Sequence, residues 1–74
     1  DLAIARSELT RAVELAPLVV NHLFLGDALW LDGNKSGAAS QWQAAATASG
    51  SESTRWSDDA LRELAKLRLA AAAK

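Results

Sequence analysis

The sequence predicts an all-α protein, built as an antiparallel array of about four helices. Alanine and leucine supply 29 of the 37 apolar residues in the 74-residue chain, a composition that favours helices over strands. Apolar residues also recur at spacings of three and four, and a proline or a glycine separates successive segments. A chain of this length forms one domain at most, so we expect residues 1–74 to fold as a single helical domain.

The first predicted helix covers residues 2–16. Asp1 is expected to cap it, because a carboxylate there can accept a hydrogen bond from an amide of the first turn. Pro17 is expected to end it, since proline has no amide hydrogen and disfavours a helical residue before it. The apolar residues that form one stripe on this helix are Leu2, Ala5, Leu9, Ala12, Val13 and Ala16.

The second predicted helix runs from residue 19 or 20 to Leu31. Apolar residues cover more than half of its circumference, so it should be buried on two sides. A membrane span needs about 20 apolar residues, and this segment is shorter and is interrupted by Asn21, His22 and Asp27. The sequence therefore gives no indication of a membrane-spanning helix.

Two further helices follow a turn at residues 32–37, which is rich in glycine and small polar residues. The third helix is expected from about Ser36 to Ala48, with Gly50 at its end and a linker-like stretch at 49–53. The last is expected at about 58–73, capped by Ser57 or Asp58. Its predicted apolar stripe consists of Ala60, Leu61, Leu64, Ala65, Leu67 and Ala71.

The chain repeats a pattern at an offset of 33 residues. A small residue, a large residue, a small residue and a helix breaker recur with the same spacing in both copies. Periods near 33 or 34 residues are typical of helix pairs that bury their apolar faces only against neighbouring pairs. The matched residues are Ala5 and Ala38, Ser7 and Ser40, Leu9 and Trp42, Ala12 and Ala45, and Pro17 and Gly50.

These residues resemble the tetratricopeptide repeat family over about residues 2–50. The residues that match the family's repeat are Leu25, Gly26, Leu29, Gly33, Ala38, Trp42 and Ala45, preceded by Ala5, Leu9, Ala12, Leu15 and Pro17. The chain departs from the pattern at His22, where the family often has Trp, and at Gly50, which replaces a closing Pro. The resemblance implies a fragment of an α-solenoid, in which stacked helix pairs form a curved array.

The phase of the match divides the chain into three parts. Residues 2–17 correspond to the second helix of an incomplete repeat, residues 19–50 to one whole repeat, and residues 57–74 to a capping helix. The array is thus expected to be interrupted at its N-terminus. The final helix could also be the first helix of a further repeat, but Arg68 stands where a large ring would be expected, which favours a cap.

The resemblance also implies a binding face, because the first helix of each tetratricopeptide repeat lines a concave groove. Projected onto this chain, the groove residues are Val20, Leu23, Asp27 and Trp30, at spacings of three, four and three. Trp30 has a second interpretation, in which it packs on the last helix or on a missing one. Trp42 is expected in the core, and Trp56 is expected to act as a hydrophobic staple or a subunit contact.

No arrangement of residues points to catalysis. His22 is the only histidine, and Asp27 lies about 140° away around the helix, so the two side chains do not face each other. The chain has no cysteine and no phosphate-binding glycine loop. We therefore expect a protein that is not an enzyme and that holds no cofactor.

The turn has a calcium-binding interpretation as a weaker alternative. Asp32, Asn34 and Ser36 place oxygens at alternate positions, as in the first half of an EF-hand loop. Gln43, however, stands where that loop needs a bidentate glutamate, so the expectation is that no metal is bound.

The function that these observations predict is a non-catalytic module for protein–protein interaction or assembly. Its partner would be a peptide segment or a neighbouring subunit that contacts the helix at 19–31. The alternative is a permanently packed structural subunit of a larger complex, including a membrane-associated one. With 8 basic and 9 acidic residues spread along the chain, no basic patch suggests nucleic acid as a partner.

Overall fold

A computed structural model describes residues 1–48 and 57–73, and this part of the chain contains four helices and no strand. The helices are α1 (Leu2–Leu15), α2 (Val19–Leu31), α3 (Lys35–Thr47) and α4 (Asp58–Ala72). The all-α fold predicted from the sequence is therefore confirmed. The predictions for Gly50, for the linker at 49–53 and for Trp56 lie outside the described residues.

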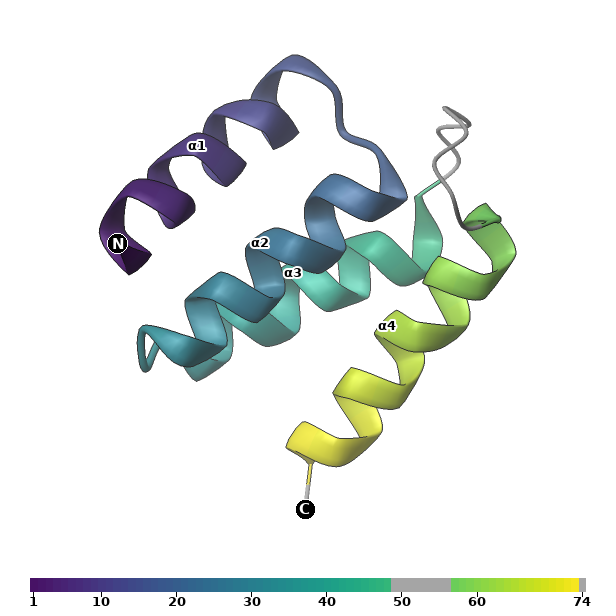
Figure 1. Cartoon of the computed structure of the whole chain (residues 1–74). Coiled ribbons are helices and arrows are strands. Elements are labelled where there is room, and N and C mark those ends of the chain that lie inside the picture. The colour runs from purple at the N-terminus through teal and green to yellow at the C-terminus, as the bar shows by residue number, and fades with distance from the viewer. Residues whose placement is uncertain (49–56, 74) are drawn as a thin grey trace.

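The helices form an array in which α2 is the central element (Figure 1). α1 and α3 lie on different sides of α2, and α4 packs across both α2 and α3. α2 and α4 run in roughly the same direction, while α3 returns antiparallel to α2. α2 therefore contacts all three other helices, as expected for a helix that is apolar on most of its circumference.

Local capping sets the helix ends. The Asp1 carboxylate accepts a hydrogen bond from the Ala3 amide at 2.8 Å, which confirms Asp1 as the N-cap of α1. Asn34 caps α3 in the same way, so this helix begins one residue earlier than predicted, at Lys35. Ser57, one of the two predicted candidates, caps α4.

Trp42 is the centre of the core. Only 3% of this residue is exposed, and the flanking residues Ala38 and Ala45 are fully buried, so the prediction of Trp42 as a core residue is confirmed. Its indole lies directly on the backbone of α2 at Gly26, where an added Cβ would be 2.4 Å from Trp42 Cδ1. The core residues shared by α2, α3 and α4 are Val19, Leu23, Ala38, Trp42, Ala45, Leu61 and Ala65.

α1 packs more loosely than the other helices. Of the helices that the structure describes, it packs on α2 alone, and none of its residues is fully buried. The predicted stripe is nevertheless correct, since each of its members is partly buried whereas Ile4 and Leu15 on the other side are exposed. Asn21 of α2 ties the end of α1 in place by donating a hydrogen bond to the Ala16 carbonyl at 2.8 Å.

The predicted stripe of α4 is wrong at three positions. Ala60, Leu67 and Ala71 are exposed, and the buried residues are Leu61 and Ala65. The reason is that α4 lies over two helices at once and turns the face around Ala65 inward, which leaves Leu67 on nearly the opposite side. The apolar residues that pack beside the buried pair are Leu64, Leu69 and Ala72.

The outer surface of α4 is charged. Asp59 pairs with Arg62 at 3.0 Å and Glu63 pairs with Lys66 at 3.1 Å, each three residues apart along the helix. Exposed pairs of this kind contribute little to stability but keep the surface hydrated. Within residues 1–48 and 57–73, each helix is too short or too polar to cross a lipid bilayer.

Candidate partner-binding groove

Two hollows lie between α2 and α4, one beside the N-terminal half of α4 and one beside its C-terminal half. We call the first the leucine groove, and its volume is about 560 Å³. Its lining residues are Leu23, Phe24, Ala60, Leu61, Glu63, Leu64 and Leu67. All of these side chains except Glu63 are apolar, so the groove offers a hydrophobic surface with one acidic residue.

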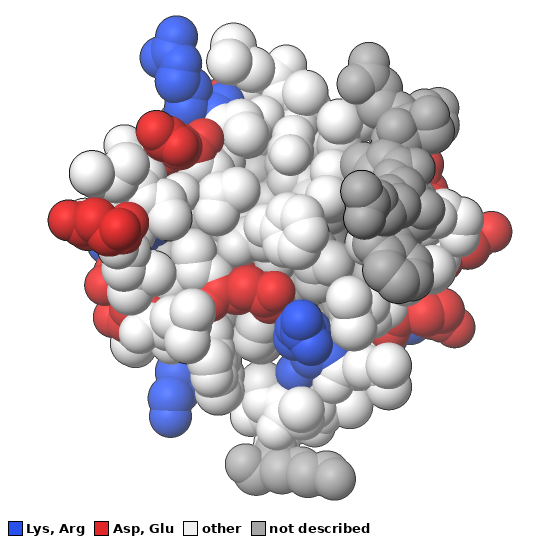
Figure 2. All heavy atoms as spheres, viewed as in Figure 1, with Lys and Arg blue, Asp and Glu red and all other residues white. Residues whose placement is uncertain are grey.

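Phe24 and Leu67 are the exposed large apolar residues of the leucine groove. Phe24 of α2 is 47% exposed and Leu67 of α4 is 65% exposed, whereas Leu23 and Leu61 are buried. In Figure 2, uncharged surface covers much of one face of the molecule, while acidic and basic side chains lie around its edge and also next to each other near its middle. Large apolar side chains exposed together in this way are characteristic of interaction surfaces.

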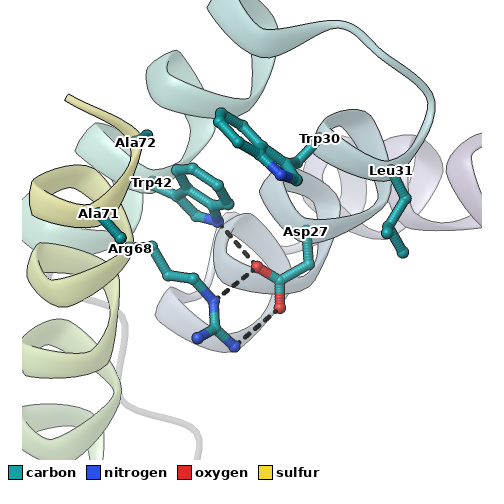
Figure 3. A pocket seen from close by; sticks show the side chains of 7 residues that line it. All are labelled: Asp27, Trp30, Leu31, Trp42, Arg68, Ala71 and Ala72. Carbon is teal, nitrogen blue, oxygen red and sulfur yellow. Dashed lines mark hydrogen bonds and ion pairs between the residues drawn. The ribbon is translucent and has the colours of Figure 1, made fainter. Parts of the chain in front are cut away.

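The second hollow, the tryptophan pocket, has a volume of about 350 Å³ (Figure 3). Its lining residues are Asp27, Trp30, Leu31, Trp42, Arg68, Ala71 and Ala72. The rings of Trp30 and Trp42 are tilted by 36° with centroids 5.5 Å apart, and Lys35 Nζ lies 5.3 Å from the Trp30 ring centroid. Trp30 is thus partly buried and forms one wall of the pocket.

Asp27 and Arg68 bridge α2 and α4 between the two hollows. Arg68 Nε donates to Asp27 Oδ1 at 3.0 Å and Arg68 Nη2 donates to Oδ2 at 3.3 Å. Trp42 Nε1 also donates to Oδ1 at 3.0 Å, so the carboxylate joins three helices (Figure 3). Because both charged side chains remain partly exposed, we assign the bridge mainly a positioning effect on α4.

The four predicted groove residues lie on α2, but the helix is rotated relative to the prediction. Leu23 is fully buried and cannot contact a partner, Val20 is partly buried against the core, and Asp27 and Trp30 line the pocket. The open face of α2 carries two residues that the prediction missed, Phe24 and Leu31. The sequence does contain a pattern that indicates this face, since Val20, Phe24, Asp27 and Leu31 follow spacings of four, three and four.

The structure does not bring the four calcium candidates together. The Asp32 carboxylate accepts from Arg6 Nη1 at 2.7 Å, and Asn34 Oδ1 caps α3. Ser36 and Gln43 both lie in α3, about 10 Å apart along its axis, whereas two ligands of one calcium ion must be within about 5 Å of each other. Across residues 1–48 and 57–73, no three His, Asp or Glu side chains form a cluster that could hold a metal ion.

His22 takes part in a local contact between α2 and α3. Its Nδ1 lies 2.8 Å from Gln41 Oε1, so this nitrogen carries the hydrogen that the amide oxygen accepts. Asp27 bonds to Trp42 and Arg68 instead, as expected from its place on another face of the helix.

Comparison with protein-family models, with curated proteins and with solved structures finds no match to this chain. The likeness to tetratricopeptide repeats therefore rests on the residues described above, and the assignment to that family stays a prediction.

The bridge between α2 and α4 can be measured with a double-mutant cycle. We expect Asp27→Asn to destabilise the fold more than Arg68→Gln, because the Asp27 carboxylate accepts from both Arg68 and Trp42. The coupling between the two positions should be about 0.5–1 kcal/mol, since the pair is partly exposed. Urea denaturation of the four proteins followed by circular dichroism provides these values, and additive effects would show that the bridge does not hold α4.

Proposed function

We propose that this protein is a non-catalytic interaction module that binds an amphipathic helix in the leucine groove. The observation that carries the proposal is the exposure of Phe24 and Leu67 across an apolar groove whose base is formed by Leu23 and Leu61. Leaving two large apolar side chains in water costs free energy that a partner can recover by covering them.

The shape of the site favours a helix as the bound segment. Two helices that run in roughly the same direction leave a groove into which the side-chain ridge of a third helix can pack. Amphipathic helices bind in such grooves through apolar residues three and four positions apart. The neighbouring tryptophan pocket offers a second place for an anchoring side chain, because its walls include Trp30 and Leu31.

The resemblance to tetratricopeptide repeats supports the same face. In that family the first helices of successive repeats line the concave groove, and the residues of α2 match such a helix in the resemblance. If α4 takes the place of the first helix of a following repeat, the leucine groove corresponds to that concave surface.

A permanently packed structural subunit is the second candidate, and α1 is the observation that favours it. This helix has no fully buried residue, and its outer side exposes Ile4 and Leu15. A neighbouring subunit that covered this side would complete the packing of α1.

The proposal can be tested with a synthetic model helix whose leucines recur at spacings of three and four and whose other residues are Lys and Glu. Titrated into the isotope-labelled chain, it should shift the amide resonances around Phe24 and Leu67 and leave those around Ile4 and Leu15 unchanged. Phe24→Ala should weaken the binding about fivefold or more, because much of a buried ring contact is lost. A peptide of the same composition with scrambled leucines is the control.

Shifts confined to α1, or equal binding of the scrambled peptide, would contradict the proposal. The first result would instead favour the structural-subunit alternative, since it would place the contact surface on the outer side of α1.

A further inference from the structure

The apolar stripe of α4 that lines the two hollows has the same spacing from either end of the helix. Its residues are Ala60, Leu64, Leu67 and Ala71, at spacings of four, three and four. When two copies of such a helix lie antiparallel, Leu64 of one copy falls opposite Leu67 of the other, and Ala60 falls opposite Ala71. The small residues at both ends let the two helices approach closely, while the leucines fill the middle.

We propose that the helix that fills the leucine groove is α4 of a second copy of this chain. This inference rests on the proposed function, because it names the partner of the same groove. In the resulting dimer each α4 lies in the groove between α2 and α4 of the other copy. The contact is then isologous, so that Leu67 of each copy packs beside Phe24 of the other, and both exposed residues become buried.

The size of the face is sufficient for a stable dimer. The Cα atoms extend over 29 × 28 × 17 Å, so the broad face shown in Figure 2 is one of the two largest surfaces of the molecule. A standard interface covers about 800 Å² of each partner, about one-sixth of the 4754 Å² that the chain exposes.

Two charged residues beside the stripe, Glu63 and Lys66, can pair with the same residues of a second copy. Glu63 and Lys66 lie on the same flank of the stripe, and a twofold axis brings that flank of one copy against the same flank of the other. In the antiparallel register, Glu63 of one copy is offset from Lys66 of the other by only about 3 Å along the helix axis. The Glu63–Lys66 pair of the single chain can therefore be replaced by two pairs between the copies.

The exposed apolar residues of α1 do not offer such a surface. Ile4 and Leu15 lie at the two ends of one face of α1, with Glu8 and Arg11 between them, so charged side chains interrupt the apolar contact. Leu15 is 74% exposed and is a leucine in a helix, as Leu67 is, which makes it a matched control for substitutions of Leu67.

The test is the dissociation constant of the dimer, measured by sedimentation velocity of the 74-residue chain over a range of concentrations. The wild-type chain should form a dimer. Leu67→Glu should raise the dissociation constant at least about tenfold, because each copy loses a leucine from the interface and places a carboxylate against the apolar Leu64 and Phe24 of the other copy. Leu15→Glu should leave it unchanged, and circular dichroism should show the same helix content in all variants.

A charge reversal tests the register. Glu63→Lys should raise the dissociation constant about threefold, because the introduced ammonium group would then face Lys66 of the other copy. Adding Lys66→Glu should restore the wild-type value, since the complementary pairs return with opposite orientation. A loss of affinity that the second substitution does not restore would contradict the antiparallel register.

The outcomes separate this inference from the proposed function. A monomer at all concentrations whose groove resonances still respond to the model helix would overturn the second copy as partner and leave the groove as a binding site. A dimer that is weakened by Leu15→Glu and not by Leu67→Glu would overturn the inference by placing the contact on α1. A monomer that does not bind the model helix would overturn both.

Discussion

Replacement of Trp42 with alanine is expected to lower the free energy of unfolding by about 3–5 kcal/mol, as for other large core aromatics. Trp42 is 3% exposed and lies in the core that α2, α3 and α4 share, so the cavity would open at the contact of three helices. A domain of this size has a total free energy of unfolding of only about 4–11 kcal/mol, so the substitution would remove a large part of it.

The control for this substitution is Trp42→Phe. It keeps a buried ring but removes the Nε1 hydrogen that bonds to Asp27, so its cost should be about 1–3 kcal/mol and clearly below that of alanine. Urea denaturation followed by circular dichroism measures both values. A decrease of less than about 1 kcal/mol in the free energy of unfolding of the alanine variant would contradict the assignment of Trp42 as the centre of the core.

Gly26→Ala should lower the free energy of unfolding, whereas the same substitution usually raises it in a helix. Alanine in place of an interior helical glycine normally stabilises by about 0.5–1 kcal/mol. Here the new Cβ would lie 2.4 Å from Trp42 Cδ1, and the ring cannot move away without disturbing the core. We therefore expect a destabilisation of about 1–3 kcal/mol, typical of an overpacked core.

The control is the same Gly26→Ala substitution made in a chain that already carries Trp42→Ala. Without the indole, the three atoms nearest to the Cβ of residue 26 are gone, and Gly26→Ala should become stabilising. Thermal unfolding of the single and double variants measures the change of sign. The same destabilisation in both backgrounds would show that the contact between Trp42 and Gly26 does not set the distance between α2 and α3.

The fold could be predicted from the sequence where local chemistry sets the structure. Asp1 and Pro17 mark the ends of α1, and the spacing of small residues around Trp42 identifies the buried face of α3. α4 was harder, because Leu64 and Leu67 lie on one side of the helix and Leu69 lies on another, so its spacing fits more than one inward face. Only the packing of α4 across two helices decides which leucine remains exposed.

The candidate site could be predicted only in part. The proposed groove includes the helix at 19–31 to which the sequence pointed. Its adjacent residues Leu23 and Phe24 lie about 100° apart around the helix, one buried and one exposed, and the apolar composition of α2 does not show which of them is which. The contact between Asp27 and Arg68 joins residues 41 positions apart, and no local pattern indicates it. Such long-range contacts depend on how α4 returns to α2.

The loose packing of α1 has a consequence for the dynamics of the chain. Among the described helices, α1 packs on α2 alone, and it has no fully buried residue, so α1 should open at a lower free energy than global unfolding. The other three helices share one core and should open together. The molecule then consists of a cooperative unit of α2, α3 and α4, from which α1 separates and to which it returns without disturbing the leucine groove.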